Sequence, residues 1–216
     1  MNRKESIYKT GLRLFSAQGY EATTTLQIAK AVGVTEPAVF YHFKNKNAFF
    51  STILGKASEF YFRCIDDSRL SAPTAFESLA KLLSIHFSVV AENPEYMRIL
   101  LRACPARLDN PESPCTKIYR QARFKLKKAL TDILIRGTTS GEFLPVDIDA
   151  TANMLLAMLN GIMHQQLTAW DNLEGVESAT IEFCRQALVG QGEQQASREG
   201  AKNAKKGEIE SLKKEV

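Results

Sequence analysis

Apolar residues recur at three- and four-residue steps along almost the whole chain, the spacing that turns one face of a helix toward a core. Strand-like alternation is almost absent. We therefore predict an all-α fold of about nine helices. With 216 residues, of which 44% are hydrophobic and 24% charged, the chain can bury a sizeable core.

Residues 24–46, TTLQIAKAVGVTEPAVFYHFKNK, predict two short helices joined by a tight turn. Thr24 and Gln27 match a capping box, which fixes the start of the first helix. Gly33 gives the backbone the freedom that the turn requires. The apolar positions of the first helix are Leu26, Ile28, Ala29 and Val32.

The second of these helices begins after Thr35, a favourable capping residue, and Pro37 lies in its first turn, where a missing N–H is harmless. Its expected packing positions are Val39, Phe40 and Phe43. Polar side chains able to contact phosphate follow, at Tyr41, His42, Lys44 and Lys46. This combination predicts a helix-turn-helix, whose second helix enters the major groove of DNA.

The stretch from Ile7 to Leu54 resembles the N-terminal domain of the tetracycline-repressor (TetR) family of bacterial regulators. The matching runs are LRLFSAQGYEATT from Leu12, IAKAVGV from Ile28 and VFYHFKNKNAF from Val39. The resemblance implies a homodimer that binds a palindromic operator in double-stranded DNA. It also implies a repressor that is released by a small apolar or amphipathic effector.

The resemblance, together with the docking of such helices, implies a set of DNA contacts. The expected base-facing residues are Thr35, Glu36, Pro37, Ala38 and Phe40, and the expected phosphate contacts are Thr25, Tyr41, His42, Lys44 and Lys46. Many relatives carry Lys where this chain has Glu36. A carboxylate there either accepts a hydrogen bond from cytosine N4 or only decorates the first helical turn. Alternatively, Phe40 belongs to the core, and Tyr41 and His42 are ordinary surface residues.

Charge and periodicity divide the chain into three parts: a DNA-binding domain over 1–48, a ligand-binding and dimerisation domain over 49–190, and a polar tail over 191–216 that we expect to be disordered. Residues 1–50 hold seven Lys or Arg against three Glu, whereas residues 51–191 are nearly neutral. A basic head on a neutral body indicates contact with a polyanion at the N-terminal end only.

The second domain lacks a motif of its own, and its sites follow from the helical pattern. We expect an effector pocket between a long helix from Asn45 to about Asp66 and the helices that follow. Its predicted lining is Phe60, His86, Phe87, Met97, Leu101, Met158 and His164. The methionines are adaptable wall residues or plain core. We also predict that the helices near 150–170 and 176–189 pair with a second copy through Ala157, Gly161 and Ala187.

Several classes of function lack support in the sequence. Motifs for phosphate loops, serine hydrolases and zinc proteases are missing, so we expect neither an enzyme nor a cofactor. The histidines and cysteines lack metal-ligand spacing.

Without a signal peptide or an apolar run long enough for a membrane span, a cytoplasmic location is expected. The basic run Arg123, Lys125, Lys127 and Lys128 is either a second nucleic-acid patch or a solvated helix face. A DNA-binding architectural protein without a ligand is the alternative function.

Overall fold

The computed structural model describes residues 2–66, 70–101, 110–168 and 172–189. These residues form helices joined by loops, with one isolated bridge between Phe143 and Val189, so the all-α prediction is confirmed. The helices are α1 (Arg3–Ala22), α2 (Thr25–Val32), α3 (Glu36–Phe43), α4 (Lys46–Cys64), α6 (Ala75–Glu92), α7 (Pro94–Leu101), α8 (Pro114–Ser140), α9 (Ile148–Thr168) and α10 (Val176–Leu188). The predicted tail over 191–216 lies outside the described residues.

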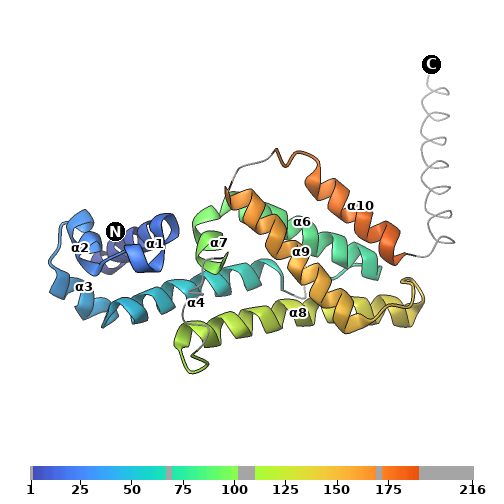
Figure 1. Ribbon diagram of the computed structural model, residues 1–216, viewed down its shortest axis with the longest axis horizontal. Coiled ribbons are helices and arrows are strands. Elements are labelled where there is room, and N and C mark those ends of the chain that lie inside the picture. Colours follow the sequence, from blue (N-terminus) through green and yellow to red (C-terminus); the bar gives the residue numbers. More distant parts are fainter. Residues whose placement is uncertain (1, 67–69, 102–109, 169–171, 190–216) are drawn as a thin grey trace, which may run out of the picture.

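The molecule is elongated, with α1, α2 and α3 at one end and a bundle of α6, α8, α9 and α10 at the other (Figure 1). Helix α4 runs from the first group into the second, and α7 lies between them. We call α1–α3 with the N-terminal turns of α4 the head, and the remaining helices the body. The two parts therefore share a rigid helix rather than a flexible linker.

Local signals set the elements of the head as predicted. Thr24 and Gln27 form the reciprocal capping box of α2, with the Gln27 N–H donating to Thr24 Oγ1 at 3.1 Å and the Thr24 N–H donating to Gln27 Oε1 at 2.9 Å. Gly33 ends α2 in the left-handed region at φ 72°, as a tight turn requires. Asn45 caps α4 by accepting the Ala48 N–H at 2.8 Å.

Two details of the helices in the head depart from regular geometry. Thr35, the expected cap of α3, occupies the capping position in extended conformation, but its side chain makes no capping hydrogen bond. Helix α1 is broken at Gly19, where φ is 85°, and one further helical turn follows to Ala22. The side chain of Gln18 holds this turn by donating to the Ala22 carbonyl at 3.0 Å.

Two clusters of buried side chains form the core. The head cluster contains Phe15, Ile28, Val39, Phe43 and the first three turns of α4 as far as Ala57, together with Ile99 and Cys115 from the body. The body cluster begins on α4 at Tyr61 and continues through the remaining helices. The domain boundary predicted after residue 48 thus falls inside α4, whose successive turns pack into both clusters.

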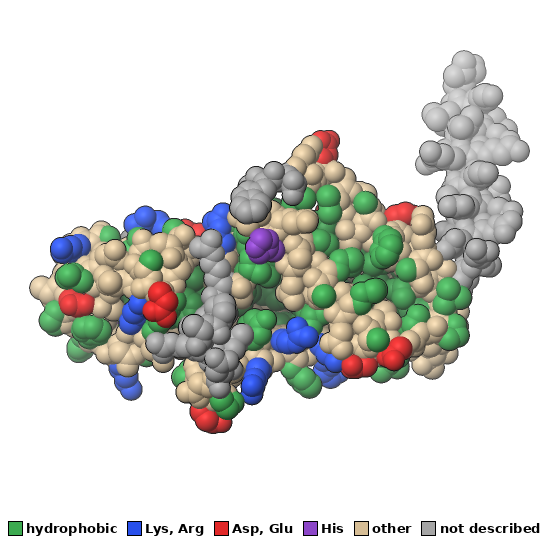
Figure 2. Space-filling view, in the orientation of Figure 1, with side chains coloured by type: hydrophobic (Ala, Val, Ile, Leu, Met, Phe, Trp, Pro, Cys, Tyr) green, Lys and Arg blue, Asp and Glu red, His purple; other side chains and the backbone are tan. Residues whose placement is uncertain are grey.

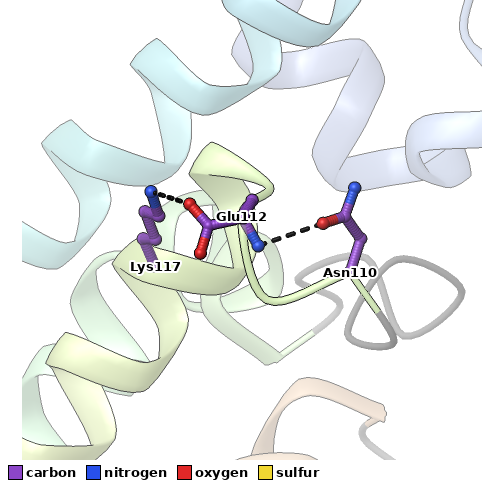
Figure 3. Close-up of polar contacts among 3 residues, drawn as sticks. All are labelled: Asn110, Glu112 and Lys117. Atoms are coloured by element: carbon purple, nitrogen blue, oxygen red, sulfur yellow. Dashed lines mark hydrogen bonds and ion pairs between the residues drawn. The ribbon is translucent and has the colours of Figure 1, made fainter.

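The start of α8 is defined by polar contacts just before it (Figure 3). The backbone N–H of Glu112 donates to Asn110 Oδ1 at 3.0 Å, and the Lys117 ammonium lies 2.7 Å from Glu112 Oε2. These contacts hold the chain against the first turn of α8. As a result, Cys115 is buried against α4, with its Sγ 3.3 Å from Ser51 Oγ.

Candidate functional site

The second helix of the helix-turn-helix, α3, is anchored on one side and free on the other. Val39 and Phe43 are buried, and the Phe43 ring stacks on Phe49 of α4 with ring centroids 3.9 Å apart. Tyr41, on the opposite side, is 86% exposed. The helix therefore presents a surface to solvent while its inner face is fixed to α4.

Two large apolar side chains of the helix-turn-helix are exposed. Leu26, one of the apolar positions of α2, is 46% exposed, and Phe40 on α3 is 38% exposed, so the prediction that Phe40 is a packing position is wrong. Helices of eight residues bury only one narrow face, and Ile28, Val39 and Phe43 already fill it. Phe40 is thereby available at the surface of α3, where its predicted role as a base-facing residue places it.

The other predicted DNA contacts differ in their exposure to solvent. Thr35, Pro37, Phe40, Tyr41 and Lys44 are exposed, Glu36, Ala38, His42 and Lys46 are half-buried, and Thr25 is buried. Lys44 ends α3 with φ 57°, and its N–H donates to the Phe40 carbonyl at 2.8 Å. Lys44 therefore forms the turn that ends α3.

Lys46 also has a structural role that the sequence did not reveal. Its ammonium lies 4.3 Å from the centroid of the Tyr20 ring and donates to the Glu21 carbonyl at 3.3 Å. A cation over an aromatic face is stabilised by the ring quadrupole. Lys46 therefore ties the start of α4 to the end of α1 at the edge of the proposed DNA surface.

A hydrogen bond across the turn joins the first residues of the two helices. Thr25 Oγ1 donates to Glu36 Oε1 at 2.5 Å, and Thr25 is only 7% exposed. A hydroxyl has one proton to donate, so the Thr25 hydroxyl cannot donate to Glu36 and to a phosphate at once. The pair instead fixes the Glu36 carboxylate at the N-terminal end of α3, with Oε2 left to accept another donor.

This geometry predicts that Thr25 orients Glu36 for base recognition. Thr25→Val should relax the preference for a base with an exocyclic amino group, because the carboxylate loses its fixed orientation, and Thr25→Ser should restore it. A well-placed base contact is worth about 1–3 kcal/mol of discrimination. DNA selected by each variant from a random pool provides the measurement. An unchanged selected sequence for Thr25→Val would show that Glu36 does not depend on Thr25.

The body contains a cavity of about 70 Å³ among five helices, and the cavity is partly open to solvent. Its lining is mostly apolar. The described lining residues are Tyr61 and Phe62 of α4, His86 of α6, Met97 and Leu100 of α7, Tyr119, Ala122, Arg123 and Leu126 of α8, and Leu156, Asn160 and Met163 of α9. An apolar lining with a few polar side chains suits a small organic molecule.

Of the pocket residues predicted from the sequence, only His86 and Met97 are in this lining. His164 is exposed on α9. Phe60, Leu101 and Met158 pack against the edge of the body cluster, and Phe87 is buried elsewhere on α6. The face of α8 formed by Tyr119, Ala122, Arg123 and Leu126 was not predicted to line the cavity, although its helical spacing is visible in the sequence.

His86 is held at the inner end of the cavity by hydrogen bonds from both ring nitrogens. Nε2 lies 3.1 Å from the Leu159 carbonyl, which can only accept, so Nε2 carries the proton. Nδ1 then accepts from Tyr61 Oη at 2.8 Å. Burial lowers the pKa of His86 to about 4, because the charged ring would lose its hydration. His86 is therefore neutral near pH 7 and connects α4, α6 and α9.

The low pKa of His86 predicts a specific dependence of stability on pH. Between about pH 4 and pH 6.5 the unfolded chain binds more protons at this residue than the folded chain. The free energy of unfolding should therefore rise with pH across that window, with a slope that corresponds to nearly one bound proton. Thermal unfolding of the wild type and of His86→Gln over this range tests it. Equal slopes in the two proteins would contradict the assignment.

The basic run on α8 is largely engaged by other side chains. Lys127 lies 2.6 Å from Asp149, and Lys128 lies 2.5 Å from Asp132. Lys125 stands over the Phe62 ring at 5.4 Å from its centroid. These contacts favour a solvated helix face over a second nucleic-acid patch. Within the described residues no group of three metal-ligating side chains occurs, and no helix is long and apolar enough to cross a membrane.

Comparison with known proteins places these features in a family. Residues 7–53 match the family model described as bacterial regulatory proteins, tetR family. An uncharacterized HTH-type transcriptional regulator of Bacillus subtilis, YerO, is 31% identical over 106 residues, which cover 46% of this chain and 35% of that protein. The nucleoid occlusion factor SlmA of Photobacterium profundum is 25% identical over 76% of this chain and 83% of its own length.

A solved structure shares the arrangement of the helices. The crystal structure of AibR in complex with isovaleryl coenzyme A and operator DNA superposes with a TM-score of 0.71 at 18% identity. The superposition covers 84% of this chain and 97% of that one. The likeness extends through the body and therefore supports the fold of the whole described chain, beyond the 47 residues that the family model matches.

Proposed function

The chain belongs to the TetR family of bacterial regulatory proteins, and on this basis we propose that it is a repressor released from its operator by a small molecule. One observation carries the proposal: the second helix of a helix-turn-helix, with an exposed face, and a separate apolar cavity both adjoin the same helix, α4. AibR, which shares the fold, is a protein whose structure contains both operator DNA and an acyl coenzyme A.

The connection between the cavity and the head includes α7 as well as α4. Met97 of α7 lines the cavity, whereas Ile99, two residues further on, is buried in the head cluster. Tyr8 of α1 donates to Tyr96 Oη of α7 at 3.4 Å. A molecule that enters the cavity and displaces Met97 would therefore also displace the contacts that hold α1. We propose that α7 and α4 together transmit effector binding to the head.

The proposed repressor acts as a dimer. On α9 the exposed side carries Met154, Ala157 and Gly161 at three- and four-residue steps, and on α10 Phe183 and Ala187 are exposed four residues apart. Hydrophobic side chains lie on the face of the body that α9 and α10 cover (Figure 2). We call these exposed residues of α9 and α10 the stripe. Its small residues permit close approach of a second copy of the chain, and two-fold pairing of α9 and α10 with the same helices of that copy would bury the stripe.

The dimer makes the position of each head important. Two reading helices must meet successive major grooves about 34–36 Å apart, so a displacement of a few ångströms prevents simultaneous contact. An effector that lowers operator affinity a hundredfold must contribute about 2.7 kcal/mol of coupling between the two sites. By reciprocity, saturating operator must weaken effector binding by the same factor.

The test has two steps. Sequences selected from a random DNA pool should form a palindrome, and a screen of small metabolites should then find one that releases the selected site. Effector affinity is measured with and without operator. Equal affinities would mean that the bound molecule does not regulate DNA binding. A protein that selects DNA but responds to no molecule would instead fit the alternative, an architectural DNA-binding protein.

A further inference from the structure

The charge of the cavity lining points to the chemical class of the effector. Among the described lining residues Arg123 is the one basic side chain, and none is acidic. Arg123 is exposed, whereas Tyr61 and His86 are buried, so Arg123 lies on the solvent side of the lining. A bound molecule therefore meets a positive charge at the entrance and apolar walls behind it.

Arg123 makes no ion pair within the described part of the chain, unlike three lysines of the same helix α8. Lys117 pairs with Glu112, Lys127 with Asp149, and Lys128 with Asp132. The guanidinium of Arg123 makes no such ion pair, and it is the member of this run that faces the cavity. A planar guanidinium with its donors unused is well suited to a carboxylate, which it can bind with two hydrogen bonds.

Two further donors line the same cavity. The hydroxyl of Tyr119 and the side-chain amide of Asn160 have no hydrogen-bond partner among the residues that the structure describes. Tyr119 is one helical turn from Arg123 on α8, and Asn160 faces the cavity from α9. Both side chains can donate to an anionic oxygen. The cavity thus offers three unused donor groups from two helices.

The inner end of the cavity disfavours charged or polar groups of a ligand. The chain of hydrogen bonds from Tyr61 through His86 to the Leu159 carbonyl uses both ring nitrogens of His86. The surrounding wall consists of Phe62, Met97, Leu100, Leu126, Leu156 and Met163. An ionised group in this region would lose its hydration without gaining a partner, which is costly. An apolar body fits this end of the cavity.

We propose that the cavity binds an amphipathic carboxylate, with its anionic group at Arg123, Tyr119 and Asn160 and its hydrocarbon part against the inner wall. The assignment rests on the proposed function, in which this cavity is the effector site. It adds the requirement for a single negative charge at one end of an apolar molecule.

The experiment compares three amphiphiles of equal chain length on the full protein by calorimetry: decanoate, decan-1-ol and decyltrimethylammonium. Decanoate should bind most tightly and the ammonium least. Arg123→Gln should weaken decanoate binding by about tenfold, the order expected for losing one charge-assisted contact, while decan-1-ol changes little. Arg120→Gln is the matched control, because Arg120 is an exposed residue of α8 outside the cavity lining.

A second variant locates the site. Ala122→Phe places a ring in the cavity and should weaken both decanoate and decan-1-ol. The proposal is overturned if none of the three amphiphiles binds, if decanoate and decan-1-ol bind equally, or if Arg123→Gln and Arg120→Gln have the same effect. Binding that survives Ala122→Phe would also overturn it, since the site would lie elsewhere. DNA selection is measured separately, so loss of operator binding with intact Arg123 dependence would reject only the regulatory function.

Discussion

Gly161→Arg is expected to convert the proposed dimer into a monomer and to reduce affinity for the palindromic site by roughly a hundredfold or more, because joint binding of two linked sites contributes about 10²–10⁴ in avidity. Gly161 belongs to the exposed stripe of α9, and a Cβ added there meets no atom within 4 Å. The variant chain can therefore fold normally. In the proposed dimer, however, each arginine would lie in the interface, where its bulk and its charge oppose association.

Sedimentation at micromolar concentration measures the state of association, and fluorescence anisotropy measures binding to the selected operator. Ala91→Arg is the control, since Ala91 is exposed near the end of α6, outside the stripe. It should remain a dimer with unchanged operator affinity. A Gly161→Arg protein that sediments as a dimer would refute this interface, and a wild-type monomer would refute the dimer itself.

Gly11→Ala is expected to destabilise the head by about 2 kcal/mol, within the range of 1–3 kcal/mol typical for overpacking a core. A Cβ at Gly11 would lie 2.4 Å from Phe49 Cζ and 2.9 Å from Cε1. The Phe49 ring cannot readily move away, because it stacks on Phe43 and meets the edge of Phe15 at 5.8 Å between centroids. Since Phe43 belongs to the reading helix, operator binding should weaken as well.

Gly55→Ala on α4 is the matched control. Its Cβ would lie 3.9 Å from Ile118 Cδ1, an ordinary contact, so the better helix propensity of alanine should stabilise the protein by up to about 1 kcal/mol. Urea unfolding of both variants gives the two free energies, which should change in opposite directions. A Gly11→Ala protein as stable as Gly55→Ala would mean that the Phe49 ring can move aside at little cost.

The sequence alone determined the elements of the head, because local hydrogen bonds and backbone conformations set them. Thr24 and Gln27 cap α2, Gly33 supplies the left-handed residue of the turn, and Asn45 starts α4. Each signal acts over three or four residues and is therefore visible in the order of the amino acids. The all-α class follows from the same short-range periodicity.

Only the tertiary structure decided which side chains meet. The bond from Thr25 to Glu36 and the exposure of Leu26 and Phe40 depend on how α2 and α3 cross. The lining of the cavity comes from five helices in distant parts of the chain. A pocket predicted from the apolar positions of each helix therefore included His86 and Met97 but not Arg123. Periodicity identifies the buried face of a helix, but the partner of that face is set by packing between residues far apart in sequence, for which a single sequence carries no local signal.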